Sequence, residues 1–457
     1  MSADTRLVYR FNADVLSVNR AGERITIDVK GWHLLAFTAK APAYADAIMA
    51  LTGNGAPLRQ LEAIGAASSD PAEASSAVRY YIERFTRARL LAWSIADDGG
   101  ELAQADALAS RFQPRLDNPP AQDLHLCRFA YVHRDETGVA LESGLSPVRA
   151  TLMDRGIQAL SERLAKPRPA KGDGFVEALW RLGFLDVAAP QESESRRCWQ
   201  FHDVLMHANS RHNRDSAAVG GTYRFKEKFP APPAIKPAVS GETILLPPVD
   251  EKKIRDSSDA LDEVQSRRRS DRSFADSPIP LSMLSEFLWR VCRTREFIPS
   301  DLQDLIGRPY PAGGSINELE FYLAVRHCEG LEPAIYHYDS HNHRCVRIAD
   351  SKAIAEKLIE RSCQAMGLAK DERRPAVTIA ITSRLPRLAW KYEGMAYRAS
   401  LMNAGVVFQT MYLVATDMGL APCANGTGDS RLLAEATGLD MFEETTIAEF
   451  ALGMPSK

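Results

Sequence analysis

The sequence lacks the long apolar run that a membrane-spanning helix requires. Its most apolar stretch, residues 399–415, is interrupted by Ser400, Asn403 and Gln409, and it is shorter than the roughly 20 residues that cross a bilayer. The opening residues, MSADTRLVYRFNADV, carry several charges and no apolar segment, so we expect no signal peptide. We therefore expect a protein without a membrane partner.

Cysteine is scarce and scattered. The seven cysteines are odd in number and form no Cys-x-x-Cys pair, which argues against a zinc ribbon, an iron–sulfur site and a secreted disulfide framework. We expect reduced thiols in a cytoplasmic protein.

Neither sign of charge is in excess. Fifty-six Lys and Arg stand against 59 Asp and Glu, a formal net charge of -3, which does not suggest a nucleic-acid partner held by bulk positive charge. Hydrophobic residues make up 45% and charged residues 25%, ordinary values for a globular protein. The length of 457 residues is enough for roughly two to four domains.

The first half of the chain reads as two winged-helix-like domains. In residues 1–115, strand patterns at 7–11 and 25–31 precede helical periods at 44–51 and 78–91 and a hairpin around an Asp-Asp-Gly-Gly turn. Residues 121–227 repeat this order loosely, with a hairpin in FAYVHRDETGVALES and helices expected around 149–165 and 174–185. Because no face is dense in Lys and Arg, a peptide bound along the wing strand is favoured over DNA.

The second half begins after a Pro-rich stretch. Six prolines between 230 and 248 prevent a helix and predict an extended linker, residues 228–249. Residues 250–457 then mix helix and strand. We expect a helix at 281–292 and strands at 321–325, 334–338, 345–349, 377–382 and 449–453. A helix at 395–419, apolar almost all round, should be central and buried, with a dimer partner as one means of covering it.

The histidines do not predict a metal site. On a helix a five-residue spacing turns each side chain by about 140° from the last, which scatters His202, His207 and His212 around the axis. A second group lies near an expected turn, YHYDSHNHR, and reads as solvated loop residues: His337, His341 and His343. No phosphate-binding loop of the Walker type and no serine nucleophile elbow occurs.

Four segments carry residues suited to chemistry. RRRSDRSF (267–274) offers guanidinium groups for phosphate, and RPYPAGGSINELE (308–320) lets backbone approach a flat ligand because glycine has no Cβ. WKYEGMAYR (390–398) joins an ammonium to a phenol, and either can serve as a general base. APCANGTGDS (421–430) can present backbone N–H groups to an anion. Each segment alone is equally compatible with an ordinary surface turn or loop.

Together and in this order, the four segments resemble the SagB-type dehydrogenases, the McbC-like thiazoline/oxazoline oxidases of the FMN-dependent nitroreductase superfamily. The resemblance extends over essentially all of 250–457 and includes the Gly-Leu-x-Pro-x-x-Tyr-His-Tyr hairpin, the QTMYLVAT helix and the closing AEFALG. More faintly, the first half is similar to the long members of that family, whose winged-helix domains clamp a substrate peptide. WQFHDVLMHANSR at 199–211 is the segment that carries this second likeness.

The resemblance implies an α+β, nitroreductase-like FMN domain behind two winged-helix-like domains, and a role for each matching residue. The implied FMN contacts fall in three groups: Arg268, Arg269, Ser270 and Arg272 for the phosphate, ribityl chain and pyrimidine edge; Pro311, Ala312, Gly313, Gly314 and Ser315 along the isoalloxazine; and Gly426, Thr427 and Gly428 through backbone. Lys391 and Tyr392 match the catalytic pair. Ala312 and Ser315 stand where the family usually has Ser and Ala, and Ala448 replaces a glycine.

The implied reaction is the oxidation of azolines to azoles in a ribosomally made, modified peptide, with O2 reoxidising the flavin. The ring must lose a Cα proton and a Cβ hydride equivalent. Tyr392 beside Lys391 is the expected base, and Lys391 itself is the alternative. The resemblance also implies a homodimer with FMN at its interface and, as an open question, a cyclodehydratase partner.

Two other interpretations stay open. One is a flavin oxidoreductase with a different substrate: a carrier-bound thiazoline, a dehydroamino-acid peptide, or a nitro or enone compound reduced with NAD(P)H. The other is a non-catalytic scaffold that recruits peptides.

Overall fold

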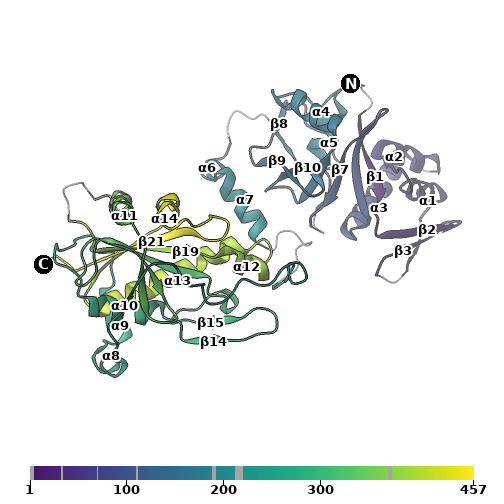
Figure 1. Ribbon diagram of the computed structural model, residues 1–457. Helices are drawn as coiled ribbons and strands as arrows, with labels where there is room; N and C mark the ends of the chain where they lie inside the picture. Colours follow the sequence, from purple (N-terminus) through teal and green to yellow (C-terminus); the bar gives the residue numbers. More distant parts are fainter. Residues whose placement is uncertain are drawn as a thin grey trace. The chain divides into compact units, whose positions relative to one another are not determined.

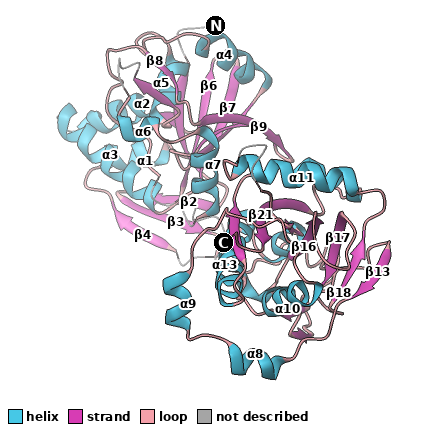
Figure 2. Ribbon diagram, turned by 90° about the vertical axis from the view of Figure 1, so that its left-hand side faces the viewer, coloured by secondary structure: helices cyan, strands magenta, loops and turns pink. Residues whose placement is uncertain are grey.

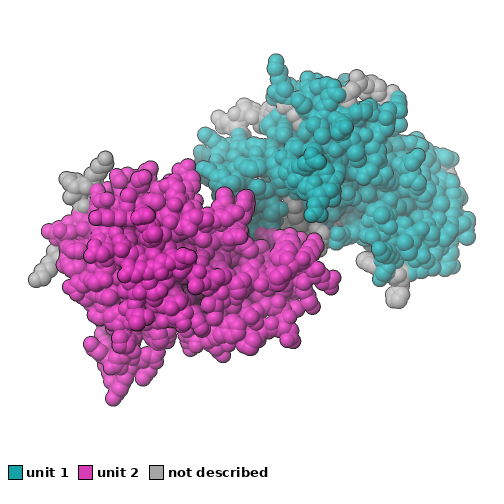
Figure 3. Space-filling view, in the orientation of Figure 1, with its two compact units in different colours: residues 1–217 teal, residues 218–457 magenta. Residues whose placement is uncertain are grey.

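The computed structural model describes residues 5–31, 34–68, 70–109, 112–187, 192–211, 220–368 and 373–456. These form two compact units, residues 1–217 and residues 218–457 (Figures 1 and 3). No helix in the described ranges is both long enough and apolar enough to cross a membrane.

Unit 1 is built on an antiparallel sheet that both N-terminal blocks share. Its order is β5-β1-β6-β7-β11-β10-β9, with β1 Arg6–Phe11, β5 Ala56–Pro57, β6 Leu91–Asp97, β7 Gly100–Ala107, β9 Ala130–Asp135, β10 Gly138–Ser143 and β11 Val148–Leu152. A three-stranded sheet holds β2 Val15–Ala21, β3 Arg24–Val29 and β4 Leu35–Thr38, and β8 Leu124–Leu126 pairs with β12 Leu185–Val187. Because β7 pairs with β11, one sheet crosses the expected boundary near residue 115, and the two winged-helix-like domains stay a prediction.

Helices cover this sheet. They are α1 Pro42–Met49, α2 Leu58–Gly65, the 3-10 helix η1 Ala66–Ser68, α3 Pro71–Arg87, α4 Asp154–Leu164, α5 Gly174–Arg181, α6 Glu194–Arg197 and α7 Phe201–Ser210. The expected helix around 149–165 is wrong over its first residues, which form β11. Val148, Ala150 and Leu152 are buried and their neighbours only partly so, a period of two that belongs to a strand. His202 and His207 lie on α7, and His212 lies outside the described residues.

Unit 2 confirms the predicted α+β class. Its antiparallel sheet runs β13-β18-β17-β16-β19-β21-β20, with β13 Glu242–Leu245, β16 Leu319–Val325, β17 Ala334–Asp339, β18 Arg344–Arg347, β19 Val377–Ser383, β20 Ala421–Asn425 and β21 Thr445–Gly453, and a side hairpin of β14 Glu296–Ile298 and β15 Leu305–Gly307. The helices are α8 Glu251–Ser257, α9 Leu261–Arg267, α10 Leu281–Cys292, the 3-10 helix η2 Gly313–Ser315, α11 Lys352–Ala365, α12 Leu385–Lys391, α13 Ala396–Asp417 and α14 Ser430–Thr437.

Both faces of this sheet are covered by helices. β16 is buried at every residue, with Phe321 and Leu323 in the core that α10 and α13 share and Tyr322 and Ala324 in the core under α11 and α14. Figure 2 shows α11 and α10 on opposite sides of the strands. A strand covered on both faces reads as a continuous apolar run, which is why the central strands were readable from sequence.

Helix α13 is buried on one side only. Val407 and Met411 are fully buried against the sheet, whereas Met402 keeps 61% of its surface exposed, and Leu401 and Val406 are also exposed. We expected a helix covered on all sides. Within unit 2, α13 is covered on the side that faces the sheet and exposed on the other.

The Pro-rich stretch lies on unit 2. Trp390 Nε1 donates to the carbonyl of Phe229, Arg387 donates to that of Pro232, and Arg384 donates to that of Pro233. Farther on, β13 pairs with β18 at the sheet edge. Proline has no N–H to donate, so the carbonyls carry the attachment. We call residues 229–236 the strap.

The strap gives the first prediction. Arg387 has no exposed surface and donates to the carbonyls of Pro232, Asp304 and Ile316. Arg387→Ala leaves these carbonyls without a donor, so we expect the free energy of unfolding of unit 2 to fall by about 3 kcal/mol. Urea denaturation measures the loss, and limited proteolysis should cut near 229–236 faster. Arg255→Ala, at an exposed arginine of α8, should change neither, and equal stability of both variants would contradict the attachment.

Candidate functional site

Polar side chains inside α13 organise the site. Asn403 Oδ1 accepts a hydrogen bond of 3.0 Å from the backbone N–H of Gly313. Its Nδ2 donates to both carboxylate oxygens of Glu318, each at 3.1 Å, and Ser400 Oγ donates to the same carboxylate at 2.9 Å. Glu318 has no exposed surface. A buried carboxylate needs such donors. The network therefore holds the loop that contains Gly313 and Gly314, called the diglycine loop, to α13.

The diglycine loop meets the predicted catalytic pair. Gly314 has φ +61, and a Cβ there would lie 2.2 Å from Tyr392 Oη and 2.8 Å from Lys391 Nζ. Lys391 Nζ donates to the Gly314 carbonyl at 3.4 Å. Only glycine fits this position, and the structure thus brings together two segments predicted separately, 311–315 and 391–392.

The arginine segment lies at the other end of α13. Ser270 Oγ and Tyr412 Oη are 2.7 Å apart, and Tyr412 Oη also accepts from the backbone N–H of Ala424 at 2.8 Å. The Arg268 guanidinium lies 5.3 Å from the Tyr412 ring centre. Tyr412 therefore fixes the segment to both α13 and β20.

The remaining arginines of this segment are exposed. Arg269 pairs with Asp271 at 3.2 Å and keeps 79% of its side chain exposed, and Arg272 is exposed as well. Arg268 therefore packs on an aromatic ring, whereas Arg269 and Arg272 face solvent, where an anionic ligand can reach them.

The two clusters are spaced along one helix. Asn403 and Tyr412 are nine residues apart on α13, which corresponds to about 14 Å along the axis. The diglycine loop is anchored at the first residue and the arginine segment at the second. Nine residues make two and a half turns, so the two anchoring side chains point to opposite sides of α13.

The third group of implied FMN contacts, residues 426–428, is an exposed loop at the end of β20. Thr427 N and Oγ1 each donate to Asn425 Oδ1 at 3.1 Å. A Cβ on Gly426 would meet nothing within 4 Å, so that backbone is open to a ligand, whereas a Cβ on Gly428 would lie 2.4 Å from Glu449 Oε1.

Glu449 is a buried acid beneath this loop. It has no exposed surface; Asn425 Nδ2 donates to its Oε2 at 3.2 Å, and its Oε1 has no partner within the described part of the chain. Burial raises the pKa of Glu449 to about 7. A neutral acid is the form that tolerates an unpartnered oxygen there.

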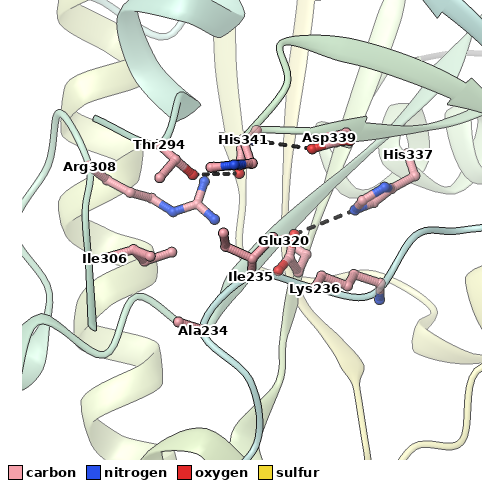
Figure 4. A pocket seen from close by; sticks show the side chains of 11 residues that line it. Ala234, Ile235, Lys236, Thr294, Ile306, Arg308, Glu320, His337, Asp339 and His341 are labelled. Atoms are coloured by element: carbon pink, nitrogen blue, oxygen red, sulfur yellow. Dashed lines mark hydrogen bonds and ion pairs between the residues drawn. The ribbon is translucent and has the colours of Figure 1, made fainter. Parts of the chain in front are cut away.

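A small polar cavity lies beside β16 and β17. Arg308, Glu320 and His337 line it together with strap residues (Figure 4), and its volume is about 10 Å³, room for about one water. His337 is 4% exposed, with Nε2 3.4 Å from Glu320 Oε2. Burial opposes the charge on Glu320, but the His337 hydrogen bond and Arg308 outweigh it and lower its pKa to about 2.

The solvated-loop interpretation of two histidines is wrong. His337 belongs to β17, whose residues are buried between helices, and His343 Nε2 lies 2.9 Å from Ser285 Oγ while its Nδ1 lies 2.8 Å from Tyr338 Oη. His341 and His343 both lie in the turn that follows β17, and His341 is the exposed one of the three histidines.

Unit 1 holds a larger cavity. Its volume is about 390 Å³, and its lining includes Arg115, Arg181, Arg196 and Asp186. Arg196 pairs with Asp186, and Arg181 donates to Glu177 and to the carbonyls of Arg115 and Asp117.

Sequence reasoning named Ser400 and Asn403 only as interruptions of an apolar helix. A polar residue at a buried helical position needs a partner, and that signal was enough to mark them. Tyr412 carried no such signal, since an aromatic residue on an apolar helix is usually core.

Glu449 yields the second prediction. Its pKa is raised in the native state, so the native protein binds a proton that the unfolded chain releases above pH 4.5, and stability falls as pH rises toward 7. Glu449→Gln removes this dependence, so its stability relative to the parent should grow between pH 5 and 8, by up to about 3 kcal/mol. Urea denaturation at several pH values tests this, and parallel curves would contradict a buried neutral acid.

Known families match both units. The nitroreductase family model matches residues 266–454, and the model described as cyanobactin oxidase ThcOx matches residues 124–216. A Methanocaldococcus jannaschii protein that carries the name nitroreductase is 29% identical over 184 residues, which are 40% of this chain and 83% of that relative.

Solved structures are more distant. The Escherichia coli microcin synthetase McbBCD complex with truncated pro-MccB17 bound is 17% identical, with 53% of this chain and 84% of that chain covered and a TM-score of 0.35. An Anabaena variabilis protein, also titled a nitroreductase, is 15% identical, with 99% and 80% covered and a TM-score of 0.40.

The site described above lies within residues 266–454, which match the nitroreductase model. Residues 124–216, earlier in the chain, match the cyanobactin oxidase model. Residues 266–454 therefore form a nitroreductase-family domain, and the resemblance of the chain to the SagB-type, McbC-like oxidases of that superfamily is confirmed.

Proposed function

We propose that this protein is an FMN-dependent dehydrogenase that oxidises azoline rings to azoles in a ribosomally made peptide. The observation that carries the proposal is the contact of Lys391 and Tyr392 with Gly314. In this proposal the phenol of Tyr392 and the ammonium group of Lys391 flank Gly313 and Gly314, which have no side chains to exclude a flat ring. The oxidase-like match at 124–216 supports a peptide substrate.

The residues present fit FMN. Arg268, Arg269 and Arg272 supply guanidinium groups for a phosphate, and Ser270, held by Tyr412, supplies a hydroxyl near them. In residues 311–315 the glycines carry no side chain, and Ser315 offers a hydroxyl where Ala312 does not. Gly426 and Gly428 can add backbone N–H groups, whereas that of Thr427 is donated to Asn425. Bound FMN supplies the acceptor for the hydride equivalent.

The chain's own contribution is to the proton. Tyr392 takes the Cα proton of the azoline, while Lys391, held by the Gly314 carbonyl, places a positive charge near the phenol oxygen. For this role the Tyr392 oxygen must lie within hydrogen-bond reach of the Cα–H of the bound azoline. The reverse assignment, with Lys391 as base, is separated from this one by the variants below.

A peptide with one thiazoline ring tests the proposal. Incubation of the purified, flavin-loaded protein with this peptide in air should lower the peptide mass by two hydrogens per ring, as read by mass spectrometry. A colourless protein that FMN cannot reconstitute would support the scaffold instead. Rapid bleaching of the flavin by NAD(P)H without ring oxidation would support the reductase.

The catalytic pair gives the third prediction. We expect Tyr392→Phe to lose at least about 100-fold in turnover, the size of a general-base contribution, with FMN retained. Lys391→Ala should lose less if Tyr392 is the base and more if Lys391 is. Tyr397→Phe, at an exposed tyrosine of α13, should keep parental turnover. Parental rates in both pair variants would remove Lys391 and Tyr392 from the chemistry.

Unit 1 is the proposed place of peptide recognition. β9 has one neighbour among the described strands, β10, so its other edge can pair with an extended peptide. The cavity of unit 1 has the size of a side-chain or small-ligand pocket. A cyclodehydratase that makes the azoline rings is the partner that this substrate requires.

A homodimer through α13 gives the fourth prediction. Leu401, Met402 and Val406 form an exposed apolar face on the helix that anchors both halves of the proposed flavin site. Met402→Glu places a charge in this face, so we expect monomers by analytical ultracentrifugation and release of FMN. Met441→Glu, at a methionine of similar exposure outside α13, should remain dimeric, and a Met402→Glu dimer would contradict the interface.

A further inference from the structure

The first described residues of unit 2 lie against the predicted catalytic pair. The backbone N–H groups of Thr222 and Tyr223 donate to the Lys391 carbonyl at 2.8 and 3.2 Å, and Gly221 forms an antiparallel bridge with Tyr392. Lys391 is the last residue of α12, so its carbonyl has no acceptor role within the helix. Residues 220–223 therefore terminate α12 at the residue that carries the ammonium group.

Tyr223 holds an uncommon backbone conformation there. Its φ is +50, a region that a bulky residue rarely enters and that costs about 1 kcal/mol or more. A Cβ on Gly221 would lie 2.9 Å from the Tyr223 ring and 3.3 Å from Lys391 Cγ. The turn brings the ring close, and strain of this kind persists where surrounding contacts over-determine it.

Those contacts are aromatic. The Tyr223 ring meets Trp390 edge to face, with ring centres 5.7 Å apart, and Trp390 is 2% exposed. Lys391 Nζ lies 6.0 Å from the Tyr223 ring centre and 5.4 Å from that of Tyr392. An ammonium group is attracted by aromatic faces at about this range. The Gly314 carbonyl and the two rings therefore flank the half-buried lysine head group on three sides.

We propose that Tyr223 is a positioning residue for Lys391, holding its ammonium group beside Tyr392 and the diglycine loop. The inference rests on the proposed function for its catalytic consequence, though not for the contact itself. Its physical basis is entropy. A lysine side chain has several free torsions, and a cage of two rings and a carbonyl reduces the rotamers it samples. Tyr223 does not touch the reacting atoms; it acts through Lys391.

The experiment measures Lys391 directly in the full-length protein. Limited acetylation followed by peptide mass spectrometry gives its labelling rate, with Lys252 on the exposed α8 as the internal reference. We expect Tyr223→Ala and Tyr223→Leu to label Lys391 about 3-fold faster, because the ring face is lost, and Tyr223→Phe to label as the parent does. Phe225→Ala is the matched control, since it removes a ring of the same segment that stacks on Phe229 instead.

Turnover of the thiazoline peptide is the second readout. Tyr223→Ala should lower kcat about 5-fold with KM unchanged, and Tyr223→Phe should restore it. Unchanged labelling in the Ala and Leu variants overturns the proposal. Where Lys391→Ala is impaired, faster labelling with parental kcat overturns it as well. If Lys391→Ala itself is fully active, the proposed catalytic pair fails, and the labelling rates still decide whether Tyr223 holds the lysine.

Discussion

The amide of Asn403 is the interaction on which the site depends. It lies on the largely apolar helix α13 and joins the backbone of the diglycine loop to the buried carboxylate of Glu318. A fully satisfied polar group in a low-dielectric core defines its partners more strictly than apolar packing does. α13 thereby positions the loop, and through Tyr412 two and a half turns later it positions the arginine segment.

Close backbone approach is the second constraint, and glycine meets it at two points. At Gly314 the missing Cβ admits the phenol of Tyr392 and the ammonium of Lys391, and at Gly428 it admits the carboxyl group of Glu449. In both places a titratable side chain occupies the space that a larger residue would fill. The titratable groups are thus packed directly against backbone. Their side chains determine the shape of the loops at Gly314 and Gly428.

The proposed catalytic pair, Lys391 and Tyr392, is also held by residues near the N-terminal end of unit 2. Trp390 and Arg387, on the helix that ends at Lys391, donate to carbonyls of the strap, and residues 221–223 close the end of the same helix. A stretch that composition marks as a linker therefore contributes order to α12. Proline-rich segments can do this because they are extended in advance and offer carbonyls without competing N–H donors.

Local pattern was sufficient for much of unit 2. Strands β16 and β19 are buried on both faces and read as apolar runs, and α10 carries a regular apolar stripe. The motifs from Arg268 to Glu449 indicated the resemblance to a flavin-dependent family through their order along the chain, which is a property of the sequence itself. The stretch 148–152 failed as a helix because so short an apolar segment satisfies either period and its pairing with β7 and β10 decided the matter.

What the sequence determined by itself was therefore most of the helices and strands of unit 2 and the segments to which the chemistry is assigned in the proposal, since these depend on neighbours within a few residues. Only the tertiary structure decided which segments meet. The pairing of Gly314 with Lys391, of Ser270 with Tyr412 and of Tyr223 with Trp390 joins residues tens to more than a hundred positions apart. Such contacts arise from packing of the sheet and α13, and no local periodicity encodes them.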